Sequence, residues 1–280
     1  MSNVIERCYE KFCYIIESRK LFDNVERFLF LFSCGKDCSM MLDLFDRYYR
    51  EHNMSQKVVY FSAPYPKHMY FWDDGEPNDN FNEIKQYWEE RRIAINYVIP
   101  PFDDFEDDDK FGCKICKRSR KEIIDKYVNE FSHGTGLLTG FTMYDALSYL
   151  NMVLLNCNFR LEDLKKLEEP LRSTTSKMLH KMSLKELLPN GKMMIRPMLP
   201  FNEQEVKAYL KISNIPYLTT DCKINKYKFK RIYSGALDLY EGFPVTYEGM
   251  ECFLEQHGIC LNNNGLSFED VENDNFFIDC

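Results

Sequence analysis

The feature that most constrains the fold is an unbroken apolar run, Phe-Leu-Phe-Leu-Phe, within residues 27–33. A strand without polar alternation suits the interior of a parallel sheet, because helices cover both of its faces. Four further segments are also predicted to be strands: residues 57–62, 94–99, 136–140 and 193–198. Helical periods fall between the strands, over residues 37–52, 80–92, 114–131 and 143–157. This alternation predicts an α/β fold, with a Rossmann-like parallel sheet and helices on both faces.

The segments around this core predict four parts of the chain. They are an N-terminal helix, a catalytic α/β core, a C-terminal helical part and an acidic tail, over residues 1–24, 25–200, 201–260 and 261–280. Residues 159–192 are charged and are expected to leave the core. In the C-terminal part, Asn202 and Glu205 match a helix capping box. Helices are expected there over residues 202–214, 223–240 and 246–257.

Charge is unevenly distributed along the chain. The net charge of −8 argues against a strongly basic nucleic-acid binder, but the acidic residues are concentrated in residues 103–109 and 262–280. A locally basic surface is therefore still open. No apolar run approaches the roughly 18–20 residues of a membrane span. The mixed-charge N-terminus resembles no signal peptide, so we expect no membrane association and a cytoplasmic protein.

A compact loop follows the first predicted strand, at the carboxyl edge where α/β sheets bind ligands. Its residues are Ser33, Cys34, Gly35, Lys36, Asp37, Cys38 and Ser39. Small residues let the backbone approach a phosphate closely, and N–H groups at a helix start favour an anion. Lys36 adds a positive charge, although the spacing of a Walker A loop is absent. The alternative is an ordinary strand-to-helix turn.

Eleven cysteines in an intracellular chain are expected to be metal ligands, catalytic thiols or buried small side chains, not a disulfide framework. Cys113 and Cys116 form a Cys-x-x-Cys pair that suits one metal or cluster, or a redox couple. Cys222 lies outside predicted regular structure and supplies a third thiol. Three thiolates leave one iron of a [4Fe-4S] cluster without a protein ligand. Other cysteines lie in amphipathic helices and are expected to be buried hydrophobes: Cys8, Cys13 and Cys157.

The loop at residues 33–39 resembles the PP-loop of the N-type ATP pyrophosphatases, usually Ser-Gly-Gly-Lys-Asp-Ser, with Cys34 and Cys38 as departures. The order of a PP-loop, a Cys-x-x-Cys followed by basic residues, and a third cysteine resembles the TtcA/TtuA-type tRNA thiolases. Ile195-Arg196-Pro197 is similar to that family's Arg-Pro-Leu segment. The resemblance covers roughly residues 27–255.

A further match follows the fourth predicted strand. Gly140 and Asp145 are similar to that family's Gly-His-x-x-Asp-Asp segment, with Phe141 and Tyr144 in place of the His and the first Asp. A carboxylate at this edge could bind Mg²⁺ or handle a proton, which makes Asp145 a catalytic candidate. The alternative is that Asp145 only caps the next helix.

The resemblance implies the adenine nucleotide alpha hydrolase-like fold and an ATP-dependent sulfurtransferase that uses ATP, Mg²⁺ and a [4Fe-4S] cluster. It implies catalytic roles for Asp145, Lys36, Cys113, Cys116 and Cys222, the three cysteines being the cluster ligands. Nucleotide-binding positions are expected at residues 33–39 and at Phe61, Ser62, Gly140 and Arg196.

Basic residues flank the proposed cluster ligands, over residues 114–121 and 223–231, with Tyr227 and Phe229 interleaved in the second segment. Such segments suit phosphate contact and base stacking, so a tRNA base is the first candidate acceptor, and solvated helix faces are the alternative. The acidic total and the missing second Cys-x-x-Cys pair leave other functions open. These are thioamide formation on a small molecule or carrier-bound amide, a cluster-free PP-loop amide ligase, and a redox or zinc-binding nucleotide sensor. A sulfur donor is an expected partner, and a homodimer is left open.

Overall fold

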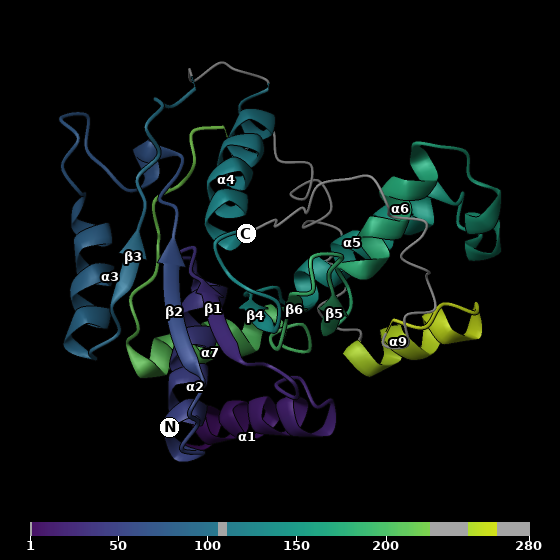
Figure 1. The fold of residues 1–280 in the computed structure, drawn as a ribbon, viewed down its shortest axis with the longest axis horizontal. Coiled ribbons are helices and arrows are strands. Elements are labelled where there is room, and N and C mark those ends of the chain that lie inside the picture. Colours follow the sequence, from purple (N-terminus) through teal and green to yellow (C-terminus); the bar gives the residue numbers. More distant parts are fainter. Residues whose placement is uncertain (1, 106–110, 225–245, 262–280) are drawn as a thin grey trace.

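The computed structural model describes residues 2–105, 111–224 and 246–261. Its centre is a six-stranded sheet in the order β3-β2-β1-β4-β6-β5 (Figure 1). All neighbouring strands are parallel except β5, which pairs antiparallel with β6 at one edge. The strands are β1 Arg27–Leu31, β2 Lys57–Ser62, β3 Ile95–Tyr97, β4 Thr135–Leu138, β5 Lys185–Leu187 and β6 Met193–Ile195. The structure thus confirms the predicted α/β class and its mainly parallel sheet.

Apolar cores on both faces of the sheet explain the unbroken apolar run of β1. Phe28 and Phe30 belong to the larger core, and Leu29 and Leu31 to the smaller one. Successive side chains of a strand point to opposite faces, so both sets of positions must be apolar when both faces are covered.

The helices divide unequally between these two cores. The smaller core contains Ile124 and Val128 of α4, and the other helices contribute to the larger one. Figure 1 shows α5, α6 and α9 extending away from the β3 side of the sheet. The helices are α1 Ser2–Ser18, α2 Lys36–Glu51, α3 Asp79–Glu90, α4 Gly112–Val128, α5 Met143–Asn156, α6 Leu171–His180, α7 Glu203–Ser213 and α9 Tyr247–Gln256, with short 3-10 helices η1 Lys67–Met69 and η2 Leu161–Lys166.

The excursion predicted over residues 159–192 is only partly separate from the core. It contains η2 and α6, but it also supplies β5, which no sequence pattern predicts. A strand of three residues is too short to show a period, and its pairing with β6 depends on tertiary contacts. The helix predicted over 223–240 falls almost wholly outside the described residues, and so does the acidic tail from residue 262.

The predicted capping box of α7 is confirmed. The Asn202 side chain accepts a hydrogen bond from the Glu205 backbone at 2.9 Å, and the Glu205 carboxylate accepts one from the Asn202 backbone at 2.8 Å. Glu205 also forms an ion pair with Lys11 at 2.8 Å. The same side chain therefore starts α7 and attaches α1 to it.

The strand order reverses between β1 and β4, because β2 and β3 extend to one side and β6 and β5 to the other. In open α/β sheets a ligand crevice forms at such a point, beyond the carboxyl ends of the two central strands. The segments at residues 33–39 and 139–142 follow these two ends. The topology therefore brings the PP-loop-like segment and Gly140 to one place.

Two expectations about the chain as a whole have partial answers. Every cysteine in the described ranges is a free thiol, and Cys8 and Cys157 are buried as predicted. Cys13, also predicted to be buried, is only partly buried, because it packs at the rim of the larger core. No helix of the described ranges has the length and apolar character needed to cross a bilayer.

Phe45 on α2 is the test of the larger core. Its ring packs edge-on against Phe28 at 5.4 Å and Phe22 at 5.9 Å between centroids. Phe45→Ala is expected to lower the free energy of unfolding by about 3–5 kcal/mol, because it leaves a cavity under β1. Urea unfolding measures the change. Tyr14→Ala removes an aromatic ring that is 68% exposed and should change stability by less than about 0.5 kcal/mol; equal losses would contradict the assignment.

Candidate functional site

The PP-loop-like segment, residues 33–39, makes a tight turn between β1 and α2. Cys34 adopts a left-handed backbone with φ of 59°, at the position where the resembling pattern has glycine. A non-glycine residue in this region costs about 1–2 kcal/mol. The Cys34 side chain is fully buried, and its Sγ lies 3.9 Å from Oγ of Ser62 at the end of β2. Burial raises the pKa of the Cys34 thiol to about 12, so this thiol is neutral.

Gly140 lies against the first turn of α2. A Cβ at this position would stand 2.7 Å from Sγ and 3.0 Å from the backbone N of Cys38, closer than real contacts allow. The Cys38 thiol is buried and accepts a hydrogen bond from the Ser33 hydroxyl at 3.1 Å. The loops after β1 and β4 are therefore in direct contact, and only glycine fits between them.

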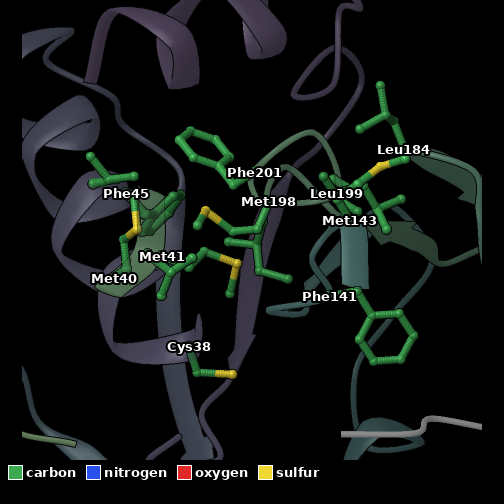
Figure 2. Close-up of a cluster of buried hydrophobic side chains, with 14 of the residues drawn as sticks. Cys38, Met40, Met41, Phe45, Phe141, Met143, Leu184, Met198, Leu199 and Phe201 are labelled. Carbon is green, nitrogen blue, oxygen red and sulfur yellow. The ribbon is translucent and has the colours of Figure 1, made fainter. Parts of the chain in front are cut away.

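An apolar cluster supports this contact from behind (Figure 2). Met40, Met41 and Phe45 of α2 face Met198 and Phe201 of the segment after β6. This packing holds α2 in place. It therefore also fixes the first turn of the helix, which carries Lys36 and Asp37.

Phe141, which replaces the histidine of the resembling pattern, belongs to the same core and is 8% exposed. Its ring lies 6.2 Å from the ring of Tyr149. The Phe141 side chain therefore packs in the larger core and contributes no polar group to the site.

Lys36 and three carboxylates meet at the start of α2. Lys36 forms ion pairs with Asp37 at 2.8 Å and with Glu203 of α7 at 2.9 Å. Burial lowers the pKa of Lys36, but Asp37 and Glu203 raise it by more, so it stays charged. Burial raises the pKa of Asp37 to about 6 against the pull of Lys36, and the charges of Asp145 and Glu203 add to the rise. Glu203 was not a candidate from the sequence.

Asp145 caps α5, which is the alternative interpretation of this residue. Its Oδ2 accepts a hydrogen bond from the Thr142 backbone at 3.1 Å, as half of a capping box. The charge of Asp145 also reaches Asp37. The carboxylate is thus placed beside the PP-loop-like segment, and its catalytic role stays a prediction.

Arg196 and Phe61 lie in packed surroundings. The Arg196 side chain is 4% exposed, forms an ion pair with Glu186 at 2.9 Å and donates to the Ser183 carbonyl at 2.9 Å. Phe61 stacks on Tyr127 of α4 with ring centroids 4.0 Å apart. Both side chains thus have structural contacts that explain their burial, and their contacts to a nucleotide stay predictions.

Tyr70 connects the PP-loop-like segment with the cysteine pair of α4. Its hydroxyl donates to the Ser33 carbonyl at 3.1 Å. Burial raises the pKa of Tyr70, the neighbouring thiols of Cys34 and Cys116 raise it further, and Arg120 opposes them. Cys116 and Arg120 of α4 are therefore near Tyr70, which contacts this segment. Arg120, counted from the sequence only among the basic residues of α4, also acts on Cys34 and is a cation of the site.

Residues 215–224, here called the strap, follow α7 in the sequence and run to the start of α4. Figure 1 shows the strap in yellow-green, rising from α7 to the end of α4 where that helix begins. The Leu218 N–H donates to the Cys34 carbonyl at 2.7 Å, and the Asn80 side chain of α3 bonds the Tyr217 carbonyl at 3.1 Å. At the far end, a Cβ on Gly112 would stand 2.6 Å from Ile224 Cδ1. The strap thus passes the PP-loop-like segment and ends against the residue before Cys113.

The three predicted cluster ligands are therefore on segments that meet. Cys222 is 8% exposed, and Cys113 and Cys116 are half-buried. In the described ranges, however, no three His, Cys, Asp or Glu side chains are arranged as a metal-binding group. Three thiols suit the ligation of an iron–sulfur cluster, although their positions in this structure do not surround a single metal ion. The second basic segment lies outside the described residues from residue 225 onward.

His68 and Asp104 are site residues that the sequence pattern does not single out. His68 Nδ1 lies 2.6 Å from Asp104 Oδ2. Burial lowers the pKa of His68, but hydrogen bonds to Asp104 and to the Cys222 side chain raise it to about 9. In the sequence Asp104 is one of six acids within residues 103–109, and nothing in that run distinguishes it.

Comparison with known proteins identifies the fold. No family model matches the chain, and no curated protein matches it. The U34-tRNA thiolase NcsA from Methanococcus maripaludis, solved with its [4Fe-4S] cluster, is similar in structure with a TM-score of 0.60 and 16% identity, over 89% of this chain and 80% of that one. FMN adenylyltransferase from Candida glabrata, solved with FMN and the ATP analogue AMPCPP, gives a TM-score of 0.40 and 13% identity over 76% and 59%. The first likeness shows that this chain has the PP-loop, adenine nucleotide alpha hydrolase-like fold that its motifs predict.

Gly140→Ala tests the contact between the two loops. Overpacking at the Cys38 backbone is expected to lower the free energy of unfolding by about 1–3 kcal/mol. Gly249→Ala in α9 is the matched control, because its Cβ would approach only Thr246 Oγ1 at 3.4 Å. That control should be neutral or gain up to about 1 kcal/mol from helix propensity. Denaturant unfolding measures the free energy of unfolding of both variants. An unchanged stability of Gly140→Ala would contradict the close approach of Gly140 to Cys38.

Asp37 predicts a pH dependence of stability. Its folded pKa of about 6 exceeds the ordinary 3.8, so the folded state holds the proton more tightly. The stability that this group contributes is present below pH 4 and is lost as the pH rises to about 6. Relative to wild type, Asp37→Asn should therefore gain stability between pH 4 and pH 7 in urea titrations. The exposed Asp73→Asn serves as control; parallel pH profiles for wild type and Asp37→Asn would count against the buried carboxyl.

Proposed function

We propose that this protein is an ATP-dependent sulfurtransferase that adenylates a carbonyl oxygen and replaces that oxygen with sulfur. The observation that carries the proposal is the meeting of three distant segments. The strap with Cys222 bonds the PP-loop-like segment through Leu218 and ends against Gly112, next to Cys113. A nucleotide-type loop and a set of thiols thus share one edge of the sheet.

The residues at the start of α2 fit the triphosphate of ATP. The first turn of α2 begins just after the carboxyl end of β1, where free N–H groups of a helix start would bind phosphate, and Lys36 and Arg120 would supply positive charge. In the ATP complex Lys36 would exchange its carboxylate partners for phosphate oxygens. Asp37 and Asp145 would hold Mg²⁺ together with those oxygens, because Mg²⁺ sites at phosphates use only one or two protein carboxylates. Burial raises the pKa of Asp37, the charges of Asp145 and Glu203 add to the rise, and a bound cation would offset these effects.

The chemistry has two stages. The acceptor carbonyl oxygen attacks the α-phosphorus of ATP, the bond to the β-phosphate breaks, and pyrophosphate leaves. Sulfide from a donor then attacks the adenylated carbon, the carbon–oxygen bond breaks, and AMP leaves with the oxygen. Lys36 and Arg120 stabilise the negative charge that develops on the phosphates in the first stage.

Cys113, Cys116 and Cys222 would hold the [4Fe-4S] cluster. When bound by three thiolates, the cluster supplies one iron without a protein ligand, to which sulfide can bind. The chain's own contribution is to carry the three thiols on α4 and the strap beside the nucleotide.

The first acceptor that we propose is a tRNA base. The basic residues of α4 lie beside the cysteine pair, and phosphate contact is their expected use. The structurally similar NcsA is a U34-tRNA thiolase, which supports the choice. A small or carrier-bound amide would use the same chemistry.

A cluster-free amide ligase of the PP-loop type is the second candidate. The observation that favours it is the absence, within the described ranges, of three ligating side chains arranged around a metal position. Such an enzyme would also form an adenylate, but an amine would take the place of sulfide.

Iron analysis with cysteine variants tests the function. Anaerobically purified wild type should be brown and contain about four iron and four sulfide per chain. Cys113→Ala and Cys222→Ala should lose the iron and the formation of thiolated tRNA, because two thiolates hold a cluster weakly. Cys252→Ala on α9 is the matched control, since this exposed thiol is outside the site, and it should keep both.

Lys36→Ala separates the two stages. It should keep the iron but lose about 100-fold or more of the ATP-dependent pyrophosphate release. A colourless wild type that releases pyrophosphate with an amine acceptor would support the ligase instead. Full thiolation activity in the Cys113→Ala or Cys222→Ala protein would refute the sulfurtransferase mechanism.

A further inference from the structure

An acidic side chain braces His68 at the edge of the site. Asp104 Oδ2 accepts a hydrogen bond from the His68 backbone N–H at 2.7 Å and lies 2.6 Å from His68 Nδ1. The other carboxylate oxygen, Oδ1, accepts a hydrogen bond from the Lys67 backbone N–H at 2.5 Å. Three contacts on one carboxylate fix both the backbone and the ring of His68. Its Nδ1 edge faces Asp104, which leaves Nε2 for other partners.

The Nε2 edge of the ring faces the strap. The Lys223 backbone N–H lies 3.3 Å from Nε2, and the Cys222 side chain hydrogen-bonds the same imidazole. His68 therefore touches the third cysteine and the residue after it. The His68 side chain is 9% exposed and Cys222 is 8% exposed, so these two side chains are largely buried where they meet, whereas the Lys223 contact is exposed.

Phe105 connects this pair with the cysteine helix. Its ring packs edge-on against His68 with centroids 5.8 Å apart. A Cβ on Gly112 would stand 2.9 Å from the same ring. Phe105 thus lies between His68 and the residue before Cys113. The contacts form a continuous path from Cys222 through His68 and Phe105 to the start of α4.

We propose that His68, braced by Asp104, is a positioning residue that orients the Cys222 sulfur toward the metal centre it would share with Cys113 and Cys116. The inference rests on the proposed function, because it takes Cys222 as the third ligand. Side chains that hydrogen-bond to metal ligands orient those ligands, and loss of such an outer partner typically lowers metal affinity about 10–100-fold. His68 acts through the contact with Cys222 and does not itself bind the metal.

Cobalt binding to the full-length, metal-free protein tests this role without enzyme activity. Co²⁺ bound by thiolates gives sulfur-to-cobalt charge-transfer bands, and its d–d bands report the ligand set. His68→Leu and Asp104→Asn should weaken Co²⁺ binding about 10–100-fold with unchanged d–d band positions. His68→Gln, which keeps an amide that can contact Cys222, should recover part of the affinity. His257→Leu at the end of α9 is the matched control and should bind like wild type.

Asp104→Asn leaves the imidazole in place, so it tests the brace even where His68→Leu unfolds, which circular dichroism detects. Wild-type affinity in both variants would overturn the inference. A shift of the d–d bands in His68→Leu would also overturn it, because His68 would then be a ligand itself. A wild type without thiolate-to-cobalt bands would remove its premise and refute it. The proposed function is judged separately, by iron content and thiolation in the Cys113→Ala and Cys222→Ala proteins.

Discussion

Burial of β1 on both faces is the constraint on which the rest of the structure depends. Phe28 and Phe30 pack in the larger core, and Leu29 and Leu31 pack in the smaller core with α4. Full burial of such a side chain contributes about 1.5–3 kcal/mol, so the two layers hold the strand firmly. Its carboxyl end is thereby fixed beside that of β4, at the point where the strand order reverses. The position of residues 33–39 follows from this packing.

Polar backbone contacts then attach the remaining parts of the site to that fixed end. The Leu218 N–H bonds the Cys34 carbonyl, and the Tyr70 hydroxyl bonds the Ser33 carbonyl. These two bonds connect the strap and the loop after β2 to the PP-loop-like segment. Ile224 then meets Gly112 at the start of α4. Segments more than 100 residues apart in sequence are in this way brought to one edge of the sheet.

The departures from the resembling motifs have a common physical character. Cys34 and Phe141 are buried and apolar in behaviour, where the resembling pattern has a glycine and a histidine. The polar contribution at this edge comes instead from Lys36, Arg120 and the carboxylate of Glu203. Charged side chains thus lie at this edge of the sheet, and buried sulfur-containing and aromatic side chains pack around them.

The sequence by itself determined the α/β class, the alternation of the first four strands with helices and the capping box at Asn202. Each of these features depends on local apolar periodicity or on a local helix-capping pattern. Such patterns can be recognised without knowledge of tertiary contacts. Only the tertiary structure decided that β5 joins the sheet, that Asp104 braces His68 and that Arg196 is buried in an ion pair with Glu186. These outcomes depend on which distant side chains meet, and neither a charged run nor a three-residue strand encodes its partner locally.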